Sequence, residues 1–145
     1  MGQLSKPGIW LKKKGYVQIY TGDGKGKTTA AIGLAVRASG HGMKTYIGQF
    51  MKGMHYGELA VLKDLSHITI EQYGDKCCIR KEEVTDVHVA QAKDGLTRAE
   101  AAMTSGGFDI VVFDEINVAI WFGLLEVSEV MAVLTRRPNH IDLIL

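Results

Sequence analysis

Short apolar runs alternate along the chain with longer segments in which apolar residues recur every three or four positions. The first pattern predicts strands and the second predicts helices. Strands are expected at residues 15–20, 44–50, 68–73, 110–113 and 140–145, and helices at 27–39, 59–65, 82–104, 118–125 and 127–135. Because strands and helices alternate, we predict an α/β fold with a mainly parallel sheet and helices on both faces.

Three of these segments predict where the core lies. Residues 110–113 form a continuous apolar run, as expected for a strand buried on both faces. The helix at 27–39 is apolar almost all round, which predicts deep packing. The helix at 82–104 carries one apolar stripe, formed by Ala92, Leu96, Ala99 and Met103.

The length of 145 residues predicts one domain. Residues 1–14 contain Pro7, Gly8 and the run Lys12-Lys13-Lys14, and we expect a flexible N-terminal arm there. The remaining residues, 15–145, form the predicted folded domain.

Composition and charge argue against several classes of protein. The net charge of +1 gives no electrostatic case for nucleic-acid binding. No apolar stretch is long enough to span a membrane, and the N-terminus lacks a signal-peptide core. The two cysteines are adjacent, at Cys77 and Cys78, and give no disulfide framework. We therefore expect a soluble, cytoplasmic protein.

The strongest chemical pattern joins the first predicted strand to the first predicted helix. A glycine-rich turn that ends in Lys-Thr and opens a helix is typical of a phosphate-binding P-loop. The usual spacing places a glycine at position 21, whereas here Thr21 stands there and Gly22 comes one residue late. Backbone amides and the helix N-terminus would hold phosphate, as would the Lys27 ammonium. The candidate nucleotide-binding residues are Thr21, Gly22, Asp23, Gly24, Lys25, Gly26, Lys27, Thr28 and Thr29.

A second element of a nucleotide site follows the apolar strand at 110–113. Asp114 would arrive at the carboxyl edge of the sheet, where it could share Mg²⁺ with the Thr28 hydroxyl. Glu115 could join the metal shell, orient a water or contact substrate. The candidate metal ligands are therefore Thr28, Asp114 and Glu115. Together the two elements predict a P-loop NTPase-like (RecA-like) domain that binds a magnesium nucleoside triphosphate.

These elements leave the reaction open, because kinases, NTPase motors and nucleotidyl-type transferases share such a site. The chain has no Asn-Lys-x-Asp guanine-binding motif and no Leu-Ser-Gly-Gly transporter motif. Gln49, Lys52 and Glu58 follow the second predicted strand, at the edge where such sheets bind ligands. They are either ligand-binding residues or ordinary polar loop residues.

The chain resembles the P-loop type of corrinoid adenosyltransferase, in segments that cover most of residues 15–145. The matching segments are Tyr20 to Ala31, Arg37-Ala38 with Gly40 to Lys44, Gln49 to Gly53 with Gly57-Glu58, Asp114 to Asn117 with Ala119, Gly123-Leu124, and Arg137-Pro138. In this family the Thr-Gly-Asp-Gly-Lys-Gly-Lys-Thr-Thr form of the loop is itself characteristic.

The resemblance implies a reaction. Such enzymes transfer the 5′-deoxyadenosyl group of ATP to Co(I) of a corrinoid and release triphosphate, with Mg²⁺ as cofactor. It also implies catalytic roles for Lys27 and Glu115, and nucleotide or corrinoid contacts for Gln49, Lys52 and Glu58. The implied partners are a corrinoid substrate, a reductase that supplies Co(I), and a second copy of the chain in a homodimer.

The chain departs from the family pattern in two places. Aromatic residues that help to bind the corrinoid are expected after the third strand, where this chain has Gly74-Asp75-Lys76-Cys77-Cys78-Ile79-Arg80. The family's C-terminal Thr-Gly-Arg segment and final helix also lie beyond residue 145. Two alternatives therefore stay open: an ATP-binding regulatory protein without transferase activity, and a small-molecule kinase.

Two smaller groups have competing interpretations. Cys77 and Cys78 favour free loop thiols over a metal site, since no nearby histidine completes a ligand set. Met51, Met54, Trp121 and Phe122 could form an apolar face for a corrin ring, although we expect Trp121 and Phe122 to lie in the core.

Overall fold

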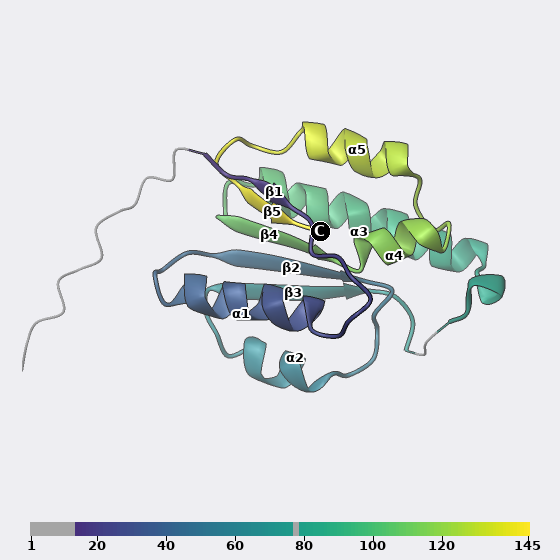
Figure 1. Cartoon of the computed structure of the whole chain (residues 1–145), viewed down its shortest axis with the longest axis horizontal. Helices are drawn as coiled ribbons and strands as arrows, with labels where there is room; N and C mark the ends of the chain where they lie inside the picture. The colour runs from purple at the N-terminus through teal and green to yellow at the C-terminus, as the bar shows by residue number, and fades with distance from the viewer. Residues whose placement is uncertain (1–13, 77–78) are drawn as a thin grey trace, which may run out of the picture.

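The chain forms one five-stranded sheet in which every strand is parallel to its neighbours (Figure 1). The computed structural model describes residues 14–76 and 79–145; the predicted arm up to residue 13 and the Cys77-Cys78 pair lie outside them. The strand order is β1-β5-β4-β2-β3. The strands are β1 (Val17–Gln18), β2 (Thr45–Phe50), β3 (Ile68–Tyr73), β4 (Ile110–Asp114) and β5 (Asp142–Ile144).

Helices connect these strands and cover both faces of the sheet. They are α1 (Lys27–Ser39), α2 (Gly57–Leu62), α3 (Asp86–Thr104), α4 (Ile116–Trp121) and α5 (Val127–Thr135), with a short 3₁₀ turn at Lys81–Glu83. Helices α1 and α2 lie on one face, and α3, α4 and α5 lie on the other (Figure 1). The predicted α/β class, with its parallel sheet between two helical layers, is confirmed.

Most expected elements are found near their predicted bounds, and the differences have local causes. Helix α3 begins at Asp86 instead of residue 82. Thr85 has an extended backbone conformation and caps the helix, since its amide donates to Nδ1 of His88 (3.0 Å). The expected strand at 15–20 contributes only Val17–Gln18 to the sheet.

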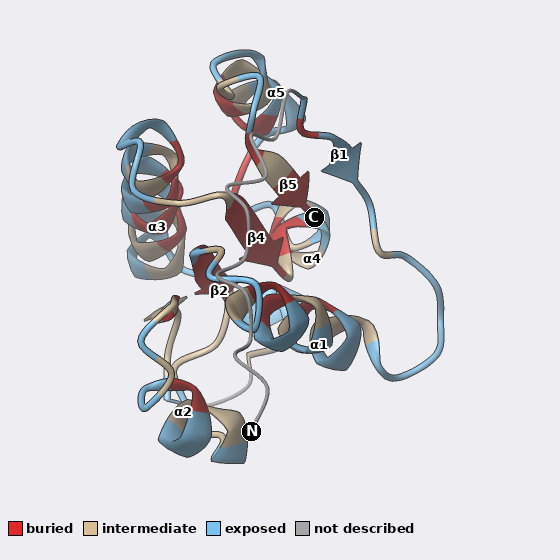
Figure 2. Cartoon of the chain, turned by 90° about the vertical axis from the view of Figure 1, so that its left-hand side faces the viewer, coloured by how far each residue is buried: buried red, intermediate tan, exposed pale blue. Residues whose placement is uncertain are grey.

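The sheet is the centre of the core, and β4 is buried along its whole length. Figure 2 shows β2, β4 and β5 buried between helices whose outward faces are exposed. The predicted stripe on α3 is confirmed, since Ala92, Leu96, Ala99 and Met103 are all buried. Burial on both faces explains why the β4 sequence is continuously apolar.

Two packing predictions are wrong. Helix α1 is not buried all round: it buries Ala31, Ala35 and Ala38 against the sheet, while Val36 on its other side is 46% exposed. Trp121 is not a core residue, as its side chain is 63% exposed with the Lys81 ammonium 4.6 Å from its ring. Helix α4 buries Ile116 and Ala119, and a 100° step per residue turns position 121 to the opposite side. Phe122 does pack against the core, as expected.

None of the helices in the described ranges is both long enough and apolar enough to cross a bilayer.

Helix α3 packs closely on β3 where Gly95 faces the ring of Tyr73. A Cβ atom at position 95 would lie 2.4 Å from Cγ of Tyr73. The Tyr73 hydroxyl is hydrogen-bonded to that of Tyr46, and both contact the Glu71 carboxylate (3.2 and 2.9 Å). Burial raises the pKa of Tyr46 to about 12 and also raises the pKa of Tyr73. Hydrogen bonds therefore hold the hydroxyl end of the Tyr73 ring, and the Cγ end has no free space beside Gly95.

Replacing Gly95 with alanine should therefore destabilise the protein, even though alanine favours helices. We expect Gly95→Ala to lower the free energy of unfolding by about 1–3 kcal/mol through overpacking. Gly33→Ala, on the exposed side of α1 where nothing lies within 4 Å of the added methyl, is the matched control. It should raise the free energy of unfolding by roughly 0.5–1 kcal/mol. Urea denaturation measures both, and equal effects at the two positions would contradict the close packing.

Candidate nucleotide-binding site

The predicted P-loop connects β1 to α1 and is exposed to solvent. Gly22 has a φ of 135° and Gly26 a φ of 111°, conformations that residues with a Cβ rarely adopt. Gly26 also caps the N-terminus of α1. The glycine that comes one residue late in the sequence therefore occupies a position that requires glycine.

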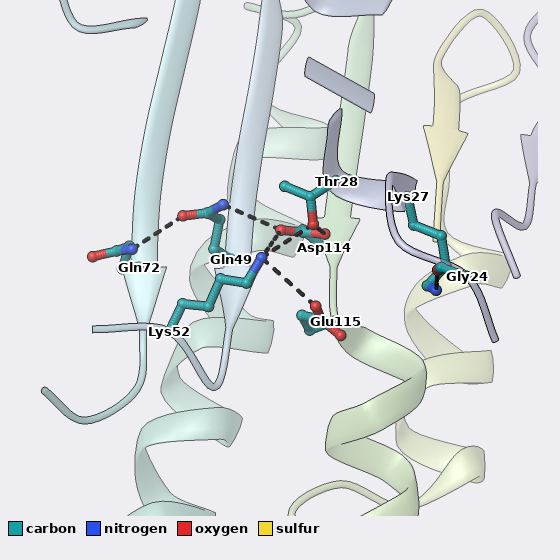
Figure 3. A network of polar contacts seen from close by, with 8 residues as sticks. All are labelled: Gly24, Lys27, Thr28, Gln49, Lys52, Gln72, Asp114 and Glu115. Carbon is teal, nitrogen blue, oxygen red and sulfur yellow. Dashed lines mark hydrogen bonds and ion pairs between the residues drawn. The ribbon is translucent and has the colours of Figure 1, made fainter. Parts of the chain in front are cut away.

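Lys27 places its positive charge inside this loop. Its Nζ donates to the carbonyl oxygens of Gly22 (2.6 Å) and Gly24 (2.7 Å). Figure 3 shows the Lys27 side chain bent back toward Gly24. The ammonium and the N-terminus of α1 together give the loop a positive potential, which suits phosphate oxygens.

Asp114 is the centre of the polar network on the other side of α1. Its carboxylate accepts three hydrogen bonds: from Thr28 Oγ1 (2.9 Å), Gln49 Nε2 (3.1 Å) and Lys52 Nζ (2.7 Å). Only 8% of Asp114 is exposed. These four residues come from α1, β2, the loop after β2, and β4 (Figure 3). The structure thus brings together Thr28, Gln49, Lys52 and Asp114, which the sequence analysis selected from three separate segments.

Gln49 is held in turn by a residue that the sequence analysis missed. Gln72 Nε2 donates to Gln49 Oε1 (3.1 Å), and the two residues are register partners on β3 and β2. Gln49 itself is fully buried. The only sequence signal for Gln72 is its place near the end of a strand, and it becomes informative only once β3 is known to pair with β2.

Lys52 lies between several oxygen atoms at the same edge of the sheet. Besides Asp114, its Nζ is 3.1 Å from Thr28 Oγ1 and 3.6 Å from Glu115 Oε1. The ring of Tyr56 lies 5.9 Å away. The Lys52 side chain is 16% exposed, so its charge is partly removed from water.

A cavity of ≈ 170 Å³ lies between the P-loop and the end of β4. Loop residues and Lys27 form one wall, and Asp114, Glu115 and the start of α4 form another. Asn117 and Val118 were not among the predicted site residues. Their position in a helix after Asp114 and Glu115 does not indicate, from sequence alone, that this helix faces the P-loop. The cavity is lined by Tyr20, Thr21, Gly22, Lys27, Ala31, Val112, Asp114, Glu115, Asn117, Val118, Ile144 and Leu145.

The remaining predicted residues lie outside the network. Asp23, Lys25 and Thr29 are exposed on the loop and at the start of α1. Glu58 is in the first turn of α2 and has no hydrogen bond or ion pair to the other described site residues.

The oxygens around Lys52 fit a hard divalent cation. Thr28 supplies a hydroxyl and Asp114 a carboxylate, with Glu115 beside them, and Mg²⁺ prefers such oxygen ligands. A cation, the Lys52 ammonium, already lies among these atoms. No group of three or more His, Cys, Asp or Glu that could hold a metal occurs within residues 14–76 and 79–145. Mg²⁺ would therefore need further oxygens from phosphate and water, as is usual for this ion.

The Asp114 network makes a prediction about stability. Gln49→Leu removes one buried donor to the carboxylate and leaves Gln72 without its partner. We expect the free energy of unfolding to fall by about 1–3 kcal/mol, because buried polar groups are left unsatisfied. Gln91→Leu, at a half-buried glutamine of α3 outside the network, should change it far less. Chemical denaturation measures both, and an equal loss at the two positions would argue against the network.

Comparisons with known proteins point to one family. Residues 13–145 match the model of a family described as ATP:corrinoid adenosyltransferase BtuR/CobO/CobP. The chain is 31% identical to a corrinoid adenosyltransferase of Pseudomonas aeruginosa over 132 residues, which are 87% of this chain and 63% of the relative. It is 33% identical to corrinoid adenosyltransferase CobA of Salmonella typhimurium over 138 residues, 89% of this chain and 65% of the relative.

A third relative is longer and has no assigned function. It is an uncharacterised protein of Nostoc sp., 32% identical over 144 residues, which are 90% of this chain and 38% of the relative. The chain thus spans less than two thirds of the length of each of these three relatives.

Proposed function

The chain belongs to the ATP:corrinoid adenosyltransferase BtuR/CobO/CobP family, and on this basis we propose that it transfers the 5′-deoxyadenosyl group of ATP to Co(I) of a corrinoid, with release of triphosphate. Thr21 to Thr29 would hold the phosphates, and Thr28, Asp114 and Glu115 would ligate Mg²⁺. The proposal concerns the activity of the whole protein, since its relatives are longer than this chain.

One observation carries the proposal beyond family membership. The Thr28 hydroxyl, at the start of the helix that the P-loop opens, lies 2.9 Å from the carboxylate that ends β4. The phosphate-binding element and the acidic element therefore meet at one point. A cavity lined by both the loop and Glu115 lies beside it.

The proposed reaction suits such a site. Co(I) attacks C5′ of the ribose, the Co–C5′ bond forms, and the C5′–O bond breaks, so that triphosphate leaves with the electron pair. The nucleophile has no proton to lose, and no general base is required. Lys27 and the loop amides would stabilise the charge that develops on the departing oxygen. Mg²⁺, when bound, would neutralise charge on the triphosphate as a Lewis acid.

The acceptor side of the site is part of the same proposal. A corrinoid would approach from the loops at the carboxyl edge, where Gln49, Lys52 and Glu58 follow β2. A reductase would supply Co(I), and a homodimer is the proposed assembly. The net charge of +1 gives no reason to add a nucleic acid to these partners.

Product analysis tests the proposal directly. The purified chain is incubated with ATP, Mg²⁺ and chemically reduced cobalamin, and adenosylcobalamin and triphosphate are quantified. We expect both in equal amounts. Lys27→Met should lower kcat by about 10²–10³-fold, as expected when one preorganised donor to a developing anion is lost. Lys63→Met, an exposed lysine that caps α2, is the control and should leave the rate unchanged.

Other products would favour other functions. ADP in place of triphosphate would indicate a small-molecule kinase. Saturable ATP binding without any product, under conditions in which a full-length relative is active, would indicate a nucleotide-binding regulatory protein.

A further inference from the structure

Lys52 holds the place in the site that the proposed function gives to Mg²⁺. Its ammonium is within 3.1 Å of both the Asp114 carboxylate and the Thr28 hydroxyl, and 3.6 Å from Glu115. These are the three residues proposed as metal ligands. In this respect Lys52 differs from Lys27, whose ammonium donates to the loop carbonyl oxygens of Gly22 and Gly24.

We infer that Lys52 is a tethered cation that competes with the divalent metal for the Asp114 carboxylate. The metal enters only when Lys52 leaves Asp114. This inference rests on the proposed function in one point only, the placing of a divalent metal at Thr28 and Asp114.

The contacts of Asp114 explain why the two cations exclude each other. Oδ1 accepts from Thr28, while Oδ2 accepts from both Gln49 and Lys52, so Oδ2 has no acceptor position left. Asp114 is also nearly buried, so little of it is open to a second cation from the cavity that it lines. A metal ion at about 2.1 Å from Oδ2 would need the space and the lone pair that Nζ uses.

Charge makes the competition depend on nucleotide. Asp114 and Glu115 carry two negative charges, of which Lys52 already balances one. A divalent cation added without nucleotide must displace the Lys52 ammonium from Asp114. It brings no anion with which the displaced ammonium could pair. A metal that arrives with triphosphate also brings negative oxygens, which can accept the displaced ammonium. Lys52 thereby disfavours free metal and favours the metal–nucleotide complex.

The backbone around Lys52 supports a positioned side chain rather than an accidental contact. Met51 has a φ of 57°, a strained conformation for a residue with a Cβ. Gly53 packs closely on the loop that follows β3, and a Cβ atom at position 53 would lie 2.1 Å from the Gly74 carbonyl oxygen. The backbone on both sides of Lys52 is thus fixed, and exchange with a metal requires only rotation of the side chain.

Metal binding to the protein without nucleotide tests the inference. Mn²⁺ is titrated into the full chain and its free fraction is followed by electron paramagnetic resonance, since Mn²⁺ suits the same oxygen ligands as Mg²⁺. Lys52→Met keeps the length of the side chain but removes its charge. We expect Mn²⁺ to bind this variant at least about tenfold more tightly than the wild type, which corresponds to about 1.4 kcal/mol.

Three further variants control the experiment. Lys52→Arg retains a cation and should bind Mn²⁺ as weakly as the wild type. Lys27→Met removes a lysine of the same site that does not contact Asp114, and should show a much smaller gain. Lys52→Gln removes the charge but still donates a hydrogen bond, so it repeats the test if Lys52→Met does not fold. The melting temperature of both neutral variants should rise more on adding Mn²⁺ than that of the wild type.

The inference is overturned if neither neutral variant binds Mn²⁺ more tightly than the wild type, or if Lys27→Met gains as much. The assay uses neither corrinoid nor ATP turnover. A failed transfer reaction with a clear gain in Lys52→Met would therefore refute only the proposed function, and active transfer with no gain would refute only the role of Lys52.

Discussion

The carboxylate of Asp114 adds hydrogen bonds and an ion pair between parts of the chain that lie far apart in the sequence. A carboxylate that is 8% exposed is costly to bury unless donors compensate its charge. Here the donors come from the first turn of α1, from β2 and from the loop that follows β2. The same bonds that compensate the charge therefore fix α1, and with it the P-loop, relative to the carboxyl edge of the sheet.

This arrangement depends on the parallel sheet. In the register of β2 and β4, Gln49 is the partner of Asp114, and in that of β2 and β3 it is the partner of Gln72. Gln72, Gln49 and Asp114 therefore lie at the same level on three neighbouring parallel strands and form one row. Buried residues lie on both sides of this row, since Ile47 and Phe50 flank Gln49 on β2 and Tyr73 follows Gln72 on β3.

Much of this could be predicted from sequence because the patterns involved are local. The bounds of α1 follow from the glycine-rich turn before Lys27 and from Gly40 after Ser39, and β4 follows from its apolar run. Other features depend on what packs against them. The exposure of Trp121 is set by which side of the short helix α4 faces the sheet. The bond between Gln72 and Gln49 is set by strand order, which no local pattern encodes.

Gly74, the first residue of the loop after β3, lies directly against the backbone beside Lys52. A Cβ on Gly74 would lie 2.5 Å from the carbonyl carbon of Met51. The backbone that carries Lys52 therefore rests directly on Gly74, and no side chain larger than hydrogen fits between them. Met51 and Gly53, on either side of Lys52, thus both lie against the start of this loop, and the position of the Lys52 ammonium beside Asp114 depends on this close backbone contact.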